Sequence, residues 1–350
     1  MRGLTRRTTV DAGCDDGAVR AIRYERYGTP DVLGVREVDV PVPVEDEVLV
    51  RVRAAAVNPL DCHLVGGVPE VVRTQSGFSA PRNAGLGVDL AGEVTAIGPA
   101  VIAFRPGDAV FGSCDLGSGV RSRAFAEYAI VRQDGSLLLK PERLTFAQAA
   151  AAPIAGLSAL QALRHKGNLQ PGQRVLINGA GGGIGTFAVQ IAKAYGGEVT
   201  AVCSGGNVAM VRELGADHVI DYTSADFLAT DLRYDLLIDL AGSRTVAEYR
   251  RVLTPRGVLV AVGGPIRGTW VGPLLGPLRL IVSSMFTSQT LAPFLTRNRR
   301  ADLIALAGLM ESGQVTPVIG RTYTLDEVPE AIGYVGAGHA SGKVIIDVGA

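Results

Sequence analysis

The residues best suited to chemistry in this sequence form a glycine-rich turn, Gly179-Ala180-Gly181-Gly182-Gly183-Ile184-Gly185. The apolar run before it, residues 174–178, is typical of a buried strand, and residues 184–195 after it have the apolar period of a helix. Because glycine carries no side chain, a pyrophosphate can approach the backbone here, and the N–H groups that start the helix would face its negative charge. We therefore predict a dinucleotide site with contacts from Gly181, Gly182, Gly183 and Ile184; the alternative is a glycine-rich turn in an unrelated α/β domain.

A second apolar run, residues 198–203, completes a β-α-β unit and is followed by Ser204. In many dinucleotide-binding units a carboxylate at this place accepts hydrogen bonds from the ribose hydroxyls of NAD. Here no carboxylate follows the strand to repel a 2′-phosphate. Ser204 and Asn207 can donate hydrogen bonds to such a phosphate, although Gly205-Gly206 supply no cation. The sequence therefore favours NADP(H) over NAD(H).

The composition excludes several classes of protein. At 350 residues, with 47% hydrophobic and 19% charged residues, the chain can bury the cores of two domains. Lys and Arg (34) balance Asp and Glu (34), which argues against a nucleic-acid partner. The four scattered cysteines have no metal-ligand spacing and form no disulfide framework, so we expect a cytoplasmic protein. Residues 1–17 lack the apolar centre of a secretory signal, and we expect a disordered extension.

The predicted elements divide the chain into two domains that are built differently. Up to residue 143 they are short strands broken by Gly and Pro, including residues 47–56, whose period of two predicts a half-buried strand. From residue 144 helices alternate with strands, which predicts a parallel sheet. We expect an α/β protein with residues 18–143 in a β domain, 144–290 in a doubly wound nucleotide-binding domain and 291–350 in a segment returning to the first domain.

The apolar stretch at residues 265–295 is interrupted by Pro and Gly too often to span a bilayer, so we expect no stable membrane insertion. We expect it to hold the last sheet strands and a segment at a subunit interface or over the substrate. Attachment to a membrane surface is the alternative. Residues 278–282 could form an edge strand that pairs across a homodimer.

Several further motifs occur in order along the chain. They include Ala56-Val57-Asn58-Pro59-Leu60-Asp61, Gly87-Val88-Asp89-Leu90-Ala91-Gly92, Phe104-Arg105-Pro106-Gly107-Asp108 and Leu214-Gly215-Ala216-Asp217-His218-Val219-Ile220-Asp221-Tyr222. With the glycine turn, they resemble the medium-chain dehydrogenase/reductase superfamily, in its zinc-independent, quinone-oxidoreductase-like branch, close to the reticulon-interacting reductases. The resemblance implies a GroES-like β domain, a Rossmann domain, an active site in the cleft between them and a homodimer.

The same resemblance bears on zinc. Zinc alcohol dehydrogenases carry Cys-His where this chain has Val57-Asn58, and Gly-His-Glu where it has Gly87-Val88-Asp89. A catalytic zinc needs about three thiolate, imidazole or carboxylate ligands, and valine supplies none. Cys62 comes too late in the sequence to substitute. We therefore expect no zinc and no other metal.

The resemblance also implies roles for single residues. Asn58 would be the polar residue beside the nicotinamide and the substrate; the alternative is a loop-capping asparagine. His63 falls where relatives have an aromatic residue and could donate a proton, whereas a packed or solvated loop histidine is the alternative. Ser158 would contact the nicotinamide ribose or amide, unless it only starts a helix.

Three further expectations concern the cofactor and the substrate. By resemblance, Tyr222 would lie near the 2′-phosphate, and the backbone of Val262-Gly263-Gly264 would contact the nicotinamide amide. Arg121-Ser122-Arg123 departs from the glycines of relatives. It could attract an acidic or phosphorylated substrate, such as an acyl thioester, or form an exposed, solvated loop.

The expected absence of a metal narrows the chemistry. Nothing would stabilise the alkoxide of a simple alcohol, whereas hydride addition to a quinone or a conjugated carbonyl places charge on an oxygen that hydrogen-bond donors can hold. Our leading hypothesis is an NADPH-dependent reductase of quinones or α,β-unsaturated carbonyls acting on a small molecule. The alternatives are a biosynthetic enoyl reductase for a bulky or carrier-bound substrate and a non-catalytic NADPH-binding sensor or scaffold.

Overall fold

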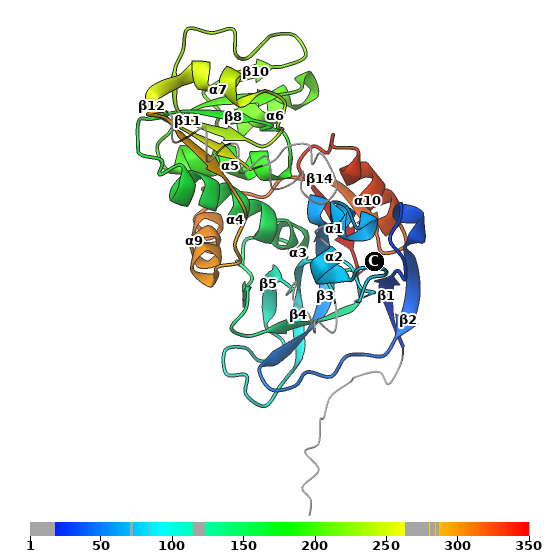
Figure 1. Cartoon of the computed structure of the whole chain (residues 1–350). Coiled ribbons are helices and arrows are strands. Elements are labelled where there is room, and N and C mark those ends of the chain that lie inside the picture. Colours follow the sequence, from blue (N-terminus) through cyan, green and yellow to red (C-terminus); the bar gives the residue numbers. More distant parts are fainter. Residues whose placement is uncertain are drawn as a thin grey trace, which may run out of the picture.

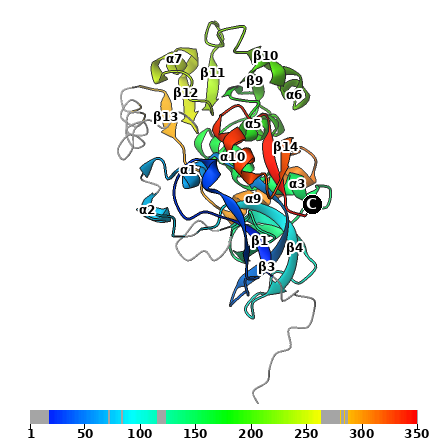
Figure 2. The same ribbon diagram turned by 90° about the vertical axis from the view of Figure 1, so that its right-hand side faces the viewer.

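Two β-sheets organise the chain, one in each of two lobes (Figures 1 and 2). The computed structural model describes residues 18–349 apart from 71–72, 83, 115–122, 263–279, 281–283 and 285–286. The first sheet has the order β14-β15-β3-β4-β5-β7, and β6 pairs with β3. Its strands are β3 Glu47–Val57, β4 Asp89–Ile97, β5 Ala109–Ser113, β6 Tyr128–Arg132, β7 Leu137–Leu139, β14 Ile319–Thr324 and β15 Lys343–Asp347.

The second sheet is parallel throughout and has the order β10-β9-β8-β11-β12-β13. Its strands are β8 Arg174–Asn178, β9 Glu198–Cys203, β10 His218–Asp221, β11 Tyr234–Asp239, β12 Leu253–Ala261 and β13 Thr290–Pro293. The order reverses between β8 and β11, which is where doubly wound sheets bind ligands. The predicted α/β class is therefore confirmed.

The remaining elements are a hairpin and the helices. The antiparallel hairpin is β1 Val19–Arg23 and β2 Gly34–Val38. The helices are η1 Pro30–Val32, α1 Pro59–Gly66, α2 Arg73–Ser76, α3 Phe146–Ala150, α4 Pro153–Gln161, η3 Ala162–Lys166, α5 Gly183–Ala194, η4 Gly205–Asn207, α6 Val208–Glu213, α7 Val246–Val252, α9 Arg300–Glu311 and α10 Val328–Gly336. In the described part of the chain, no helix has the length and apolarity needed to cross a membrane.

Strand β3 is more deeply buried than its sequence pattern predicted. Ala54 and Ala56 belong to the core around α3 and α4, while Ala55 and Val57 belong to the core of the β domain. All four side chains are nearly inaccessible to solvent. The expected half-buried strand is therefore buried on both faces at its end. The pairing of β3 with β4 shifts register between Val52 and Ala54, and α3 packs against β3.

The C-terminal elements return to the first lobe, where β15 pairs with β3 and α10 packs against α1 (Figure 1). The second sheet, however, continues past residue 290, because β13 pairs with β12 as far as Pro293. Helix α9 then packs against α4. The return to the β domain thus comes after α9, later in the chain than the boundary at residue 291 that we expected.

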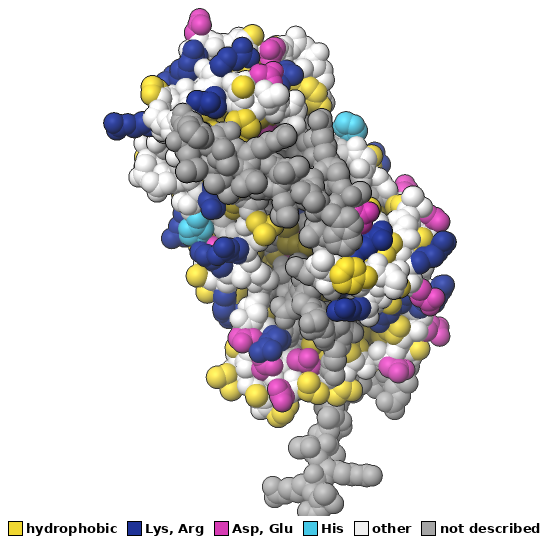
Figure 3. Space-filling model, viewed as in Figure 1, with side chains coloured by type: hydrophobic (Ala, Val, Ile, Leu, Met, Phe, Trp, Pro, Cys, Tyr) yellow, Lys and Arg dark blue, Asp and Glu magenta, His cyan; other side chains and the backbone are white. Residues whose placement is uncertain are grey.

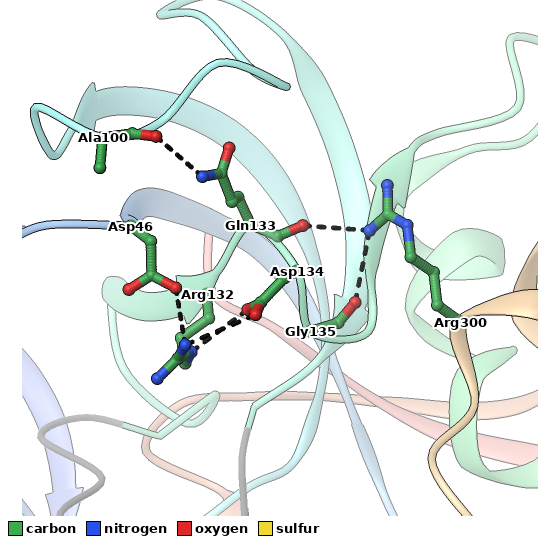
Figure 4. Close-up of polar contacts among 7 residues, drawn as sticks. All are labelled: Asp46, Ala100, Arg132, Gln133, Asp134, Gly135 and Arg300. Atoms are coloured by element: carbon green, nitrogen blue, oxygen red, sulfur yellow. Dashed lines mark hydrogen bonds and ion pairs between the residues drawn. The ribbon is translucent and has the colours of Figure 1, made fainter.

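Arg300 joins the two lobes on the side of α9 (Figure 4). Its Nη1 donates hydrogen bonds to the carbonyl oxygens of Gln133 at 3.1 Å, Gly135 at 3.3 Å and Leu137 at 2.8 Å. Ser136 also hydrogen-bonds to Asn298 in the segment that leads into α9. These contacts tie the turn between β6 and β7 to the helical layer of the second lobe.

Candidate active site

The predicted cofactor residues gather at one edge of the second sheet. In a parallel sheet all strands end at the same edge, and ligands bind there. The described candidates follow four of these strands: Gly181, Gly182, Gly183 and Ile184 after β8, Ser204 and Asn207 after β9, Tyr222 after β10, and Val262 after β12. Gly263 and Gly264 lie outside the described residues.

The glycine turn combines backbone hydrogen bonds to β9 with two positions, Gly179 and Gly185, that need glycine. Gly179 has φ +90°, and the N–H groups of Gly179 and Ala180 donate to the carbonyl oxygen of Val202 at 3.1 and 2.9 Å. A Cβ on Gly185 would lie 2.2 Å from the carbonyl oxygen of Gly179. Glycine at these places therefore lets α5 begin directly on the turn, as a dinucleotide fingerprint requires.

The start of α5 can hold a pyrophosphate. Gly182, Gly183 and Ile184 are partly exposed. The first N–H groups of a helix have no acceptor within it, and the positive end of the helix dipole lies there. A Cβ on Gly182 would meet nothing closer than the Gly179 carbonyl oxygen at 3.6 Å, so this side of the turn is open. The residues present therefore fit a dinucleotide.

The predicted ribose side also forms one cluster. Asn207 Nδ2 donates to Ser204 Oγ at 3.1 Å, and Ser341 Oγ donates to Asn207 Oδ1 at 2.6 Å. Tyr222 is 52% exposed beside them. The structure adds a carboxylate that the sequence pattern did not reveal. Asp221 Oδ2 would lie 2.8 Å from a Cβ on Gly205, and hydrogen bonds from Thr223 keep the pKa of Asp221 low.

The end of the chain reaches the glycine turn, which no local pattern predicted. The N–H of Gly342 donates to the carbonyl oxygen of Gly181 at 2.9 Å. Gly182 and Gly342 also form a parallel bridge. Lys343 follows as the first residue of β15, and a Cβ on Gly183 would lie 3.0 Å from its Cδ. The sequence signal was a lysine at the head of a strand whose three central residues are apolar.

Behind the glycine turn lies a buried network of Asn58, Asp89 and Lys343. Their residues are 2%, 0% and 4% exposed. Lys343 Nζ donates to Asn58 Oδ1 at 2.7 Å, and Asn58 Nδ2 donates to Asp89 Oδ2 at 3.0 Å. Asp89 Oδ1 also accepts a hydrogen bond from Ser113 Oγ at 2.9 Å. Asn58 thus stands at the N-cap of α1 with its side chain inside the protein.

Burial shifts the pKa values of Asp89 and Lys343 in opposite directions. Burial raises the pKa of Asp89, opposed by the nearby charge of Lys343 and by hydrogen bonds from Asn58 and Ser113. Burial lowers the pKa of Lys343, opposed by Asp89 and Asp61. Each charge is costly alone in this place and is stabilised by the other. The network therefore depends on both partners being present.

The predicted roles of His63 and Ser158 stay proposals, and the structure shows what surrounds each side chain. His63 lies on α1, and burial lowers its pKa, so its imidazole is neutral at pH 7 and is a weak acid there. Ser158 is 2% exposed; its hydroxyl donates to the carbonyl oxygen of Ile154 at 2.7 Å and shares a hydrogen bond with Thr296 at 2.6 Å. Among the residues that the structure describes, neither side chain hydrogen-bonds to Asn58, Asp89 or Lys343.

The donor set beside Asn58 does not fit zinc. Within the described ranges, no three His, Cys, Asp or Glu side chains are grouped so that they could hold a metal ion. Val57 and Val88 offer no ligand atom, and the ammonium of Lys343 already places a positive charge against Asn58 Oδ1. A second cation here would be repelled by the first.

Arg123 is 8% exposed, and its Nε and Nη1 have no hydrogen-bond partner among the residues that the structure describes. The alternative of an exposed, solvated loop is therefore wrong for Arg123. Arg121 and Ser122 lie outside the described residues.

Asp61 gives the site a pH dependence of folding. Asp61 is fully buried, and burial raises its pKa to about 7 from an ordinary value of 3.8. Between these values the native state binds a proton that the unfolded chain has lost, so stability falls as pH rises, by at most about 1.4 kcal/mol per pH unit. We expect Asp61→Asn to flatten this decline, as measured by urea unfolding from pH 5 to pH 7.5. As a control, Asp217→Asn changes an exposed carboxylate and should keep the wild-type slope of unfolding free energy against pH. If Asp61→Asn also kept the wild-type slope, the decline would not come from Asp61.

Comparisons with known proteins cover both lobes. A family model described as "Alcohol dehydrogenase GroES-like domain" matches residues 44–142, and one described as "Zinc-binding dehydrogenase" matches residues 214–346. The mouse protein "NAD(P)H oxidoreductase RTN4IP1, mitochondrial" is 33% identical, over 93% of this chain and 88% of its own length. A spinach "Quinone-oxidoreductase homolog, chloroplastic" is 30% identical, over 94% of this chain and 98% of its own length.

A solved structure agrees with these sequence relatives. The quinone oxidoreductase from Coxiella burnetii superimposes with a TM-score of 0.81 at 30% identity, covering 94% of this chain and 99% of the other. Sequence motifs, sheet order and relatives therefore lead to one conclusion: the chain belongs to the medium-chain dehydrogenase/reductase superfamily of oxidoreductases, in its quinone-oxidoreductase-like branch.

Proposed function

We propose that this protein binds NADPH and reduces a quinone or an α,β-unsaturated carbonyl without a metal. The observation that carries the proposal is the open start of α5 next to a buried network in which the ammonium of Lys343 lies against Asn58 Oδ1. Relatives named as quinone oxidoreductases support the substrate class. One matching family is described as zinc-binding, but its zinc chemistry is not carried over, because the donor set here does not fit zinc.

When bound, the reduced nicotinamide supplies a hydride. The residues of this chain would hold the cofactor and orient its nicotinamide. The N–H groups at Gly183 and Ile184 would hold the pyrophosphate. Asn58, kept in place by Lys343 and Asp89, would orient the nicotinamide end, and Val262 would place its backbone beside the amide. Since His63 is neutral at pH 7, solvent is the proton source that this arrangement favours, with His63 as the alternative.

The test is turnover by the full chain. NADPH would be mixed with 1,4-naphthoquinone and with a panel of enones, and loss of the reduced-nicotinamide absorbance would be followed. We expect turnover of at least one acceptor, unchanged after treatment with a metal chelator. No NADPH oxidation with any acceptor, or activity lost on chelation, would contradict the proposal. Turnover of carrier-bound enoyl substrates alone would favour the biosynthetic reductase, and tight NADPH binding without turnover would favour the sensor or scaffold.

The proposed preference for NADPH over NADH gives a second test. Ser204→Asp places a carboxylate where a 2′-phosphate would bind. Like charges about 5 Å apart repel by roughly 1–3 kcal/mol at this kind of surface, so kcat/KM for NADPH should fall about 5- to 200-fold. The value for NADH should change much less, because NADH has no 2′-phosphate. An unchanged ratio of the two would mean that the phosphate does not lie at Ser204.

The remaining partner predictions stay proposals. On the face shown in Figure 3, basic and acidic side chains are interspersed over both lobes, as expected of a protein that does not bind nucleic acid. Of the segment 278–282, Leu280 is described and has helical rather than strand backbone. We still propose a homodimer, but the structure gives no support for an edge strand there. A cytoplasmic location is also still a proposal.

A further inference from the structure

Lys343 contacts residues that are far from it in the sequence. It lies 285 residues after Asn58, yet Nζ is 2.7 Å from Asn58 Oδ1 and 3.0 Å from the carbonyl oxygen of Val57. The side chain is 4% exposed. Burying an ammonium costs free energy that burying a leucine would not cost. We therefore expect a role that needs the charge of Lys343.

The first consequence concerns the orientation of the Asn58 amide. An ammonium only donates hydrogen bonds, and a carboxylate only accepts them. With Lys343 on one side and Asp89 on the other, Oδ1 must face Lys343 and Nδ2 must face Asp89. The flipped amide would set donor against donor and acceptor against acceptor. The two charges therefore hold the amide in one orientation.

The second consequence concerns the hydrogen that is left over. Nδ2 has two N–H groups, and Asp89 takes one of them. The nearest acceptor for the other is the carbonyl oxygen of Ala56 at 3.4 Å, which is long for a hydrogen bond. This N–H is therefore the more weakly held of the two. Its direction is set by the two contacts that Lys343 and Asp89 make.

The third consequence is mechanical. The stem of Lys343 passes beside the start of α5, since its Cδ would be 3.0 Å from a Cβ on Gly183. The N–H of the preceding residue, Gly342, donates to the carbonyl oxygen of Gly181. One short segment of the C-terminal tail therefore touches both the glycine turn and Asn58.

We propose that Lys343 is a positioning residue of this reductase. It holds the Asn58 amide in one orientation relative to the glycine turn, so that the second N–H of Asn58 Nδ2 meets the nicotinamide end of the cofactor. The inference rests on the function proposed above and names a residue that acts through Asn58. Without the hydrogen bond from Lys343, the nicotinamide should be misplaced. The pyrophosphate should stay bound, because it is held by backbone N–H groups at the start of α5.

The test uses a neutral pair. Lys343→Met alone would leave the Asp89 carboxylate buried without a partner and is expected to fold poorly. The double variant Asp89→Asn with Lys343→Met is uncharged and similar in shape, so it should fold. Its matched control is Asp217→Asn with Lys193→Met, which neutralises a partly exposed Lys–Asp pair at 2.8 Å.

Four quantities would be measured for each variant: kcat, acceptor KM, the Kd of NADPH by fluorescence titration, and the emission of bound NADPH. For the double variant we expect kcat to fall about a hundredfold, the cost of a displacement of roughly 1 Å, with Kd within about threefold of wild type. The emission of bound NADPH should shift towards that of free NADPH. The control pair should match wild type in all four.

Asp89→Asn alone separates Lys343 from its partner. This variant leaves the Lys343 ammonium without its counter-charge and is expected to be less stable, so it is assayed at a temperature at which its unfolding curve shows it folded. There Lys343 still donates to Asn58, so kcat should stay within about tenfold of wild type. A double variant equal to wild type in kcat and emission would overturn the inference, as would Asp89→Asn losing as much as the double variant. If wild type turns over no acceptor while the emission difference persists, the proposed function fails and the role of Lys343 stands. Without turnover or an emission difference, both fail.

Discussion

Replacing Gly182 by valine should weaken NADPH binding about a hundredfold and leave the fold intact; the factor corresponds to the loss of one or two charge-assisted hydrogen bonds at 1.5–3 kcal/mol each. Gly182 has φ −83° and ψ 176°, a conformation open to any residue. A Cβ there would meet nothing closer than 3.6 Å. The added side chain would therefore begin in open space, on the side of the turn where we expect the phosphates.

The measurement is a fluorescence titration with NADPH, paired with thermal unfolding. Gly308→Val is the matched control, since a Cβ on Gly308 in α9 meets nothing within 4 Å and lies away from the turn. Gly185→Ala is the opposite case, because its Cβ would lie 2.2 Å from the carbonyl oxygen of Gly179, and we expect it to destabilise the fold. An unchanged Kd for Gly182→Val would remove the glycine turn from the cofactor site.

Replacing Asp89 by alanine should lower the free energy of unfolding by about 3–5 kcal/mol, the usual cost of removing one partner of a buried ion pair. The ammonium of Lys343 would remain buried without a counter-charge. Ser113 Oγ, Asn58 Nδ2 and the N–H of Ile154 would lose their acceptor as well. Each such buried donor left unsatisfied adds to the loss.

Urea unfolding at pH 7 measures this effect. Asp217→Ala is the control: Asp217 pairs with Lys193 at the surface, where such pairs contribute about 1 kcal/mol or less. A loss of similar size for Asp89→Ala would show that the Lys343 site is solvated and that the ion pair is not a buried one.

The parts of the fold that follow from local chemistry could be predicted from the sequence. The strand, the glycine turn and the helix at residues 174–195 depend on neighbouring residues, because a turn with φ +90° at Gly179 needs glycine wherever it occurs. The alternation of strands and helices then predicted the parallel sheet, which the structure confirms. The burial of β3 on both faces could not be predicted in the same way. It depends on a register shift against β4 between Val52 and Ala54 and on packing against α3, from a distant part of the chain.

The candidate site likewise has features that follow from local sequence and features that depend on the tertiary structure. The sequence by itself determined where a pyrophosphate could approach and that Val57 and Val88 offer no metal ligand, since both statements concern the chemistry of single residues. Only the tertiary structure decided what stands beside Asn58. The antiparallel pairing of β15 with β3 sets Val344 opposite Val57, and that register brings Lys343 to Asn58. Register between strands so far apart in the chain is set by packing of the whole sheet, which no local spacing reveals.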